Sequence, residues 1–256
     1  MNLILDDVVQ ILATGLIPFL RISALLLAAP LVSLRVVSVR IRIALALVLT
    51  IFIFPTLDLE FFDPVSASGL MLISRELLVG LLFAVVLQVV NAALVVAGNT
   101  LSMSMGLGMA QTVDPNIGRV PVLSSFLVVM STLIFLSIGG HLILIELILM
   151  SFEAMPIGVE INFIDTLANF IEWSAMVFLG AILIALPIML TMMLINICIG
   201  IVTRAAPALN IFAVGFPAMV LTGFTLFLVY LVNMGHRIEW LWLEAFKTAQ
   251  NIWVVT

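Results

Sequence analysis

Charged side chains are scarce in this sequence of 256 residues. Asp, Glu, Lys and Arg together make up 9% of the chain and hydrophobic residues make up 64%, whereas a soluble globular domain carries about 25% charged residues. So few charges cannot cover a water-facing surface, which excludes a soluble enzyme and a disordered region. At about 20 apolar residues per crossing, the composition allows at most roughly eight membrane helices.

Cysteine and histidine are almost missing. One cysteine, Cys198, and two histidines cannot assemble a disulfide or a Cys/His zinc cluster within the chain, so we expect no bound metal and no cofactor. The nine basic residues are spread singly among 14 acidic ones, which leaves no basic stripe for phosphates and argues against a nucleic-acid partner. The nucleophile, zinc-protease, phosphate-loop and intramembrane-protease motifs are absent too, which argues against an enzyme.

Long apolar stretches fill the rest of the chain. They predict an all-α, polytopic membrane protein of about six long helices, kinked or forming hairpins, over residues 11–29, 43–54, 69–97, 122–150, 170–203 and 211–233. The second stretch would span only about 18 Å of a roughly 30 Å hydrocarbon layer, and others exceed one span. These lengths favour helices matched to neighbouring subunits rather than to lipid. Residues 234–256, with three tryptophans among charged residues, are interpreted as an interfacial amphipathic tail.

The connection over residues 98–121 is rich in glycine and methionine. Connections of this length are usually functional or disordered. Methionine adapts to objects of varied shape and glycine permits close approach, so the segment suits a constriction that seals and reopens. The alternative is a small-residue helix interface followed by an ordinary turn. The candidate gate residues are Met105, Gly106, Leu107, Gly108, Met109, Ala110, Gln111, Thr112, Val113, Asp114, Pro115 and Asn116.

Polar residues inside the apolar stretches are a second group of candidates, because ionisable groups in a membrane are costly and face protein or water. Glu76, His141 and Glu146 suggest a proton relay, but isolated acids favour the alternative of buried pairs that order an assembly. The candidate assembly residues are Arg75, Glu76, Asn99, His141 and Asn196.

Residues 201–217 predict the corner of a helical hairpin. Pro207 disfavours helix at the preceding residue, and Arg204 suits the C-terminal end of a helix dipole. The corner is either a plain structural turn or a docking site for a cytoplasmic neighbour. Its candidate residues are Arg204, Pro207, Asn210, Gly215 and Pro217.

At these same residues the sequence resembles the FliR family of bacterial flagellar type III export gates, which has homologues in virulence injectisomes. The resemblance covers most of the chain and is carried by RELLVG at 75–80, AGN at 97–99, MGLGMA at 105–110, DP at 114–115, GH at 140–141, ALP at 185–187 and RAAPALNIF at 204–212 followed by GFP at 215–217. Ala208 is a departure, since the family often has a polar residue there.

The resemblance implies a non-enzymatic subunit of a helical, hetero-oligomeric pore in the bacterial inner membrane, within the flagellar basal body. FliP and FliQ would be its partners, FlhB and FlhA would lie nearby, and unfolded export substrates would pass through the pore. It also implies a FliP-like part at 1–160 and a FliQ-like hairpin at 161–233, which the tail at 234–256 follows. By position, the plug corresponds to residues 106–122 and the FlhB contact to the corner at 204–207. Alternatives are an injectisome homologue and a secondary transporter with a midplane site, suggested by Pro187 and the short second stretch.

Overall fold

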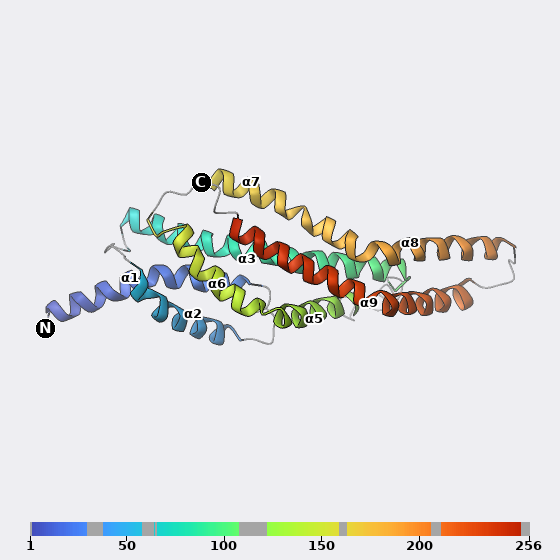
Figure 1. Ribbon diagram of the computed structural model, residues 1–256, viewed down its shortest axis with the longest axis horizontal. Coiled ribbons are helices and arrows are strands. Elements are labelled where there is room, and N and C mark those ends of the chain that lie inside the picture. Colours follow the sequence, from blue (N-terminus) through green and yellow to red (C-terminus); the bar gives the residue numbers. More distant parts are fainter. Residues whose placement is uncertain are drawn as a thin grey trace. The chain divides into compact units, whose positions relative to one another are not determined.

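The computed structural model describes residues 2–29, 38–57, 64, 66–107, 122–158, 163–205 and 211–251, and within these ranges the regular structure is entirely helical (Figure 1). This confirms the all-α prediction. The elements are α1 (Asn2–Ala28), α2 (Val39–Ile53), the 3-10 turn η1 (Phe54–Thr56), α3 (Ala67–Ser104), α5 (Val122–Ser137), α6 (Gly140–Ala154), α7 (Phe163–Ser174), α8 (Met176–Ala205) and α9 (Ile211–Asn251).

Four helices among the described residues are long and apolar enough to cross a membrane. They cover Val39–Thr56, Ala67–Ser104, Ile164–Ala205 and Gly215–Asn251, and α5 with α6 would add a fifth as one broken span. The multi-pass prediction is thereby confirmed. The second stretch, expected to be too short, is 18 residues long because α2 begins at Val39 and η1 extends it to Thr56.

Helix breaks fall at different places from those expected. The stretch at 122–150 divides at Gly139, whose φ of +72° lies in the left-handed region that favours glycine. The long fifth stretch divides at Ala175, between α7 and α8, whereas Pro187 lies inside α8 without ending it. The expected boundary at Asn233 does not exist, because α9 continues without a break to Asn251.

The chain forms two compact units. Unit 1 comprises residues 1–88, 140–173 and 245–256, and unit 2 comprises residues 89–139 and 174–244. Helices α3 and α9 contribute to both. The units are thus built from interleaved segments of the sequence, and the division into FliP-like and FliQ-like parts stays a prediction.

The core of unit 1 forms where α1, α3 and α6 meet. A Cβ at Gly80 of α3 would overlap the carbonyl oxygen of Arg21 in α1, so this crossing depends on a residue without a side chain. Ser66 begins α3 by accepting a hydrogen bond from the Gly69 N–H at 3.0 Å. The indole N–H of Trp173 donates to the Val86 carbonyl at 3.0 Å and ties the end of α7 to α3. Buried apolar side chains here include Ile17, Ile22, Leu25, Leu26, Val79, Phe83, Leu87, Leu144, Leu147 and Ile148.

The core of unit 2 is centred on Trp242 of α9, which is 1% exposed. Its indole N–H donates to Ser131 Oγ of α5 at 2.8 Å, and its ring meets the edge of Phe135 with centroids 4.7 Å apart. Leu241 of α9 packs against Gly180 of α8, where an added Cβ would lie 3.0 Å from the leucine side chain. Residues of the expected interfacial tail therefore pack against protein, since Ile238, Leu241 and Trp242 are all buried.

Candidate functional site

The glycine- and methionine-rich segment starts later than expected. Residues 98–104 belong to α3, which ends at Ser104, so the predicted start of the connection at Gly98 is wrong. A Cβ at Gly98 would overlap the backbone of Ser124 in α5, and Ser124 Oγ lies 3.1 Å from both the Val95 carbonyl and Asn99 Oδ1. The alternative of a small-residue helix interface is thus confirmed at Gly98, and Asn99 bonds within the chain.

The C-terminus of α3 is closed by a glycine cap. Gly106 has φ +78°, its N–H donates to the Met103 carbonyl at 3.0 Å, and the Leu107 N–H donates to the Ser102 carbonyl at 2.9 Å. This pair of bonds is the Schellman motif, which satisfies carbonyls that the end of a helix leaves free. The cap therefore fixes the chain as far as Leu107.

Met105 is buried, although it was predicted to belong to a gate surface. It is 0% exposed and lies over Gly223 of α9, where an added Cβ would come 2.9 Å from its sulfur. Met103, two residues earlier, is 74% exposed. Of the predicted gate residues, Gly108 to Asn116 lie outside the described residues.

A buried ion pair joins α1 to α3 in unit 1. Arg21 Nε donates to Glu76 Oε2 at 2.6 Å, and both side chains are at most 1% exposed. Arg21 also donates from Nη1 to the Ser151 carbonyl at 2.7 Å and from Nη2 to the Met155 carbonyl at 3.0 Å. Since these carbonyls lie at the C-terminal end of α6, the guanidinium caps that helix and complements its dipole.

Unpaired polar atoms lie beside this ion pair. Within the described part of the chain, Glu76 Oε1 and the Nε and Nη2 atoms of the half-buried Arg75 have no hydrogen-bond partner and no contact with solvent. Glu76 is therefore only half satisfied by Arg21. Since buried charged groups require partners, this cluster is the most polar part of the unit 1 interior.

The other predicted assembly residues are not brought together. His141 and Glu146 are exposed on α6, and Asn196 is exposed on α8. The chain alone thus does not assemble the relay considered for Glu76, His141 and Glu146.

At the predicted corner, α8 ends at Ala205 as Pro207 indicated, and Arg204 is exposed in its last turn. Gly215 is buried and Pro217 exposed in α9, whereas Pro207 and Asn210 lie outside the described residues.

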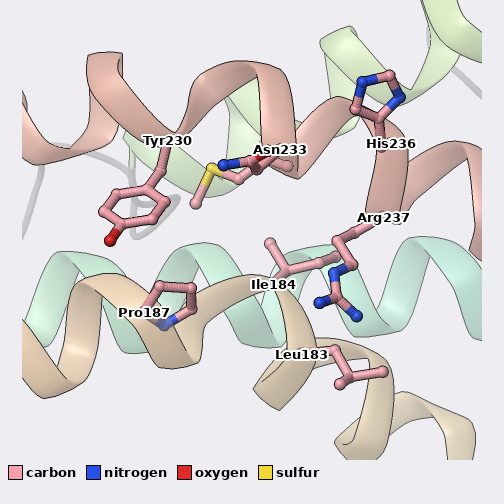
Figure 2. A pocket seen from close by; sticks show the side chains of 8 residues that line it. Leu183, Ile184, Pro187, Tyr230, Asn233, His236 and Arg237 are labelled. Atoms are coloured by element: carbon pink, nitrogen blue, oxygen red, sulfur yellow. The ribbon is translucent and has the colours of Figure 1, made fainter.

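Sequence reasoning missed two features. It named Glu76 but not its partner Arg21, because opposite charges in apolar stretches indicate that a pair exists without indicating which residues form it. It also missed a pocket of about 400 Å³ between α8 and α9 in unit 2 (Figure 2).

The family described as bacterial export proteins, family 1, matches residues 12–245. The flagellar biosynthetic protein FliR of Escherichia coli (strain K12) is 31% identical over 236 residues, which are 92% of this chain and 90% of that protein. FliR of Pectobacterium carotovorum subsp. carotovorum is 30% identical with the same coverage. FliR of Bacillus subtilis (strain 168) is 30% identical over 88% of each chain.

The long apolar helices and the similarity to these relatives both indicate the same cellular location for the chain. It is a multi-pass protein of the bacterial inner membrane and a component of the flagellar export apparatus. The match extends through both units and includes the buried pair of Arg21 and Glu76. The chain belongs to the FliR family of bacterial export proteins.

Proposed function

We propose that the chain is a structural and gating subunit of the flagellar type III protein export gate. It forms with FliP and FliQ the channel through which unfolded flagellar subunits cross the inner membrane. Its role is non-enzymatic, FlhB contacts the corner at residues 204–207, and FlhA lies nearby. Membership of the export family supports this assignment.

One observation carries the proposal: polar side chains are exposed on helices that are otherwise apolar. Asn196 is exposed in α8, whose apolar neighbours Met193 and Leu194 are 59% and 63% exposed. His141 and Glu146 are exposed on α6. In lipid, such groups would lose the hydrogen bonds that water gives them, so they face neighbouring protein or an aqueous channel.

The low burial of the spanning helices also supports contacts with neighbouring subunits. The most apolar windows of the spans at Ile164–Ala205 and Gly215–Asn251 are only 33% and 17% buried by this chain. Apolar surface alone would suit lipid, but the same helices also expose Asn196 and Asn233. Neighbouring FliP and FliQ helices would cover both kinds of side chain.

The gating role is assigned to the segment that follows α3, with Gly106 to Asn116 as the plug. Its first residues are fixed by the Schellman cap at Gly106 and by the burial of Met105. A segment held at this point can change conformation beyond Leu107 without disturbing the helix. We therefore separate an anchor, Met105 to Leu107, from the sealing part, which we assign to residues 108–116.

The test uses the tagged chain expressed with FliP and FliQ, and a variant in which a Gly/Ser linker of equal length replaces residues 108–116. FliP and FliQ should purify with both proteins, and only the variant should make cells permeable to small solutes. Asn196→Leu should reduce the amount of FliP or FliQ recovered, whereas Ser125→Ala, at an exposed serine of α5, should not. A tagged chain that emerges alone would contradict the channel, and a tight membrane in the linker variant would contradict the plug.

A further inference from the structure

One side of α3 stays exposed along a narrow line in unit 1. Between residues 71 and 88 the exposed residues of this helix follow one another at alternating intervals of three and four, and the residues between them are buried or half-buried. An interval that averages about 3.5 residues is the spacing at which one helix packs along another. The line is about 26 Å long at 1.5 Å per residue. We call it the α3 seam, and it consists of Met71, Ser74, Leu78, Leu81, Val85 and Gln88.

The α3 seam carries both apolar and polar side chains. Its four apolar members, which are methionine, leucine and valine, are between 39% and 76% exposed. Hydrocarbon could cover these side chains, but it offers no hydrogen bond to the amide of the exposed Gln88. In a pair of helices, by contrast, a polar residue in such a seam fixes the register of the partner. The combination therefore favours a protein helix over lipid.

Arg75 lies beside the α3 seam. It directly follows Ser74, at the flanking position from which paired helices form salt bridges. Its Nε and Nη2 atoms are shielded from solvent and have no hydrogen-bond partner among the described residues. Glu76 does not supply one, because adjacent residues of a helix do not face each other and its Oε2 accepts from Arg21. Since buried charged groups require partners, we expect an acceptor for Arg75 from outside the chain.

The charges around Arg75 are unbalanced. Arg75 lies close enough to Arg21 for their like charges to repel, and Glu76 is the acid that bonds to Arg21. Two guanidinium groups thus share one carboxylate in this part of unit 1. In the described part of the chain no acid forms an ion pair with Arg75. The free atoms Nε and Nη2 lie on one edge of the guanidinium plane, where a carboxylate binds through two parallel hydrogen bonds.

We propose that the α3 seam packs against a single apolar helix of a neighbouring subunit, and that an Asp or Glu of that helix pairs with Arg75. The carboxylate accepts from Nε and Nη2, a polar side chain of the same helix lies opposite Gln88, and apolar side chains fill the positions between them. The proposal rests on the proposed function, because it supplies a contact by which the chain joins the export gate.

The first experiment maps the partner by photo-crosslinking in the complex of the full-length chain with FliP and FliQ. Benzoylphenylalanine replaces Leu78 or Val85, which lie about two turns apart on the α3 seam. Both sites should link to the same helix of FliP or FliQ, at residues about two turns apart, and that helix should carry an acid at the level of Arg75. The same probe at the exposed Ser125 of α5 is the control and should not link to that helix.

The second experiment substitutes Arg75. Arg75→Gln should lower the amount of FliP or FliQ that the tagged chain retains by about tenfold, as expected for loss of one charge-assisted contact. Arg75→Lys should fall between the two, because it keeps the charge but loses the planar fork. Arg40→Gln is the matched control, since it removes an exposed charge from α2.

The isolated chain distinguishes a partner contact from an internal one. Its unfolding temperature should not fall in Arg75→Gln, because Arg75 bonds to no described residue and its removal relieves the repulsion of Arg21. A fall as large as that in Glu76→Leu would make Arg75 an internal stabilising residue and overturn the proposal.

Two further outcomes would also overturn it. One is that Leu78 and Val85 link to lipid, to a second copy of this chain or to unrelated segments, and the other is unchanged retention of FliP and FliQ in Arg75→Gln. If the wild-type chain retains FliP and FliQ in these cases, the channel function stands and only this contact fails. A wild-type chain that emerges alone would contradict both.

Discussion

Arg21 and Glu76 are 55 residues apart in sequence and form a 2.6 Å ion pair in the interior of unit 1. The same guanidinium donates to two carbonyls at the end of α6, and its Cζ lies 4.4 Å from the centre of the Phe152 ring. One side chain therefore connects α1, α3 and α6. Because all three helices are apolar, this polar contact fixes which faces meet.

Replacing either member of the pair should destabilise the chain strongly. Arg21→Leu or Glu76→Leu leaves one buried charge without its partner, which costs about 3–5 kcal/mol. The double variant should cost less than the sum of the two, since no isolated charge remains. It should not recover fully, because the α6 carbonyls lose their donor. Thermal unfolding of the purified protein and its level in membranes measure these effects.

Glu146→Gln is the control for this series, because Glu146 is an acid exposed on α6. Its unfolding temperature should match that of the wild type. Strictly additive losses in the double variant would show that Arg21 and Glu76 do not act as a pair.

Gly98 should tolerate no side chain. An added Cβ would overlap the backbone of Ser124, and backbone cannot move aside as a flexible side chain can. Gly98→Ala should therefore separate α3 from α5 and lower the unfolding temperature. Gly200→Ala in α8 is the matched control, because nothing lies within 4 Å of its added Cβ, and alanine in a helix interior should stabilise by about 0.5–1 kcal/mol. If both variants shift the unfolding temperature in the same direction, close packing at Gly98 is not the cause.

The sequence was sufficient to predict which segments are helical, because apolar runs separated by short polar connections leave few alternatives in a membrane protein. The end of α8 at Ala205 agrees with the sequence as well, since a proline at position 207 disfavours helix at the residue before it. Sequence reasoning misplaced the start of the Gly/Met connection, because Gly98 and Asn99 have low helix propensity and tertiary packing against Ser124 overrides that propensity.

Pairings between distant helices were beyond sequence reasoning. Arg21 had several acids in the chain as possible partners, and only the crossing of α1 over α3 at Gly80 selects Glu76. The tail was ambiguous for a related reason. An amphipathic helix with tryptophans suits either a lipid interface or a protein groove, and Ser131 with Phe135 selects the groove for Trp242.

Met105 and Met103, both at the end of α3, differ in burial: Met105 is buried and anchors the segment that follows, whereas Met103 is exposed. Met105→Ala removes a fully buried side chain above Gly223, so it should cost about 2–5 kcal/mol through lost contacts and a cavity. Met103→Ala, at a side chain that is 74% exposed, should change stability by no more than about 0.5 kcal/mol. Thermal unfolding of the two purified variants measures this difference.

The same pair of variants tests how the proposed plug is held. If the anchor at Met105 positions residues 108–116, Met105→Ala should make cells permeable to small solutes at a temperature where the protein still folds, and Met103→Ala should not. Permeability in Met103→Ala alone would place the sealing contact on the exposed methionine instead. Because the substitution type is the same and the positions are two residues apart, a difference between them reports burial against α9 rather than loss of methionine chemistry.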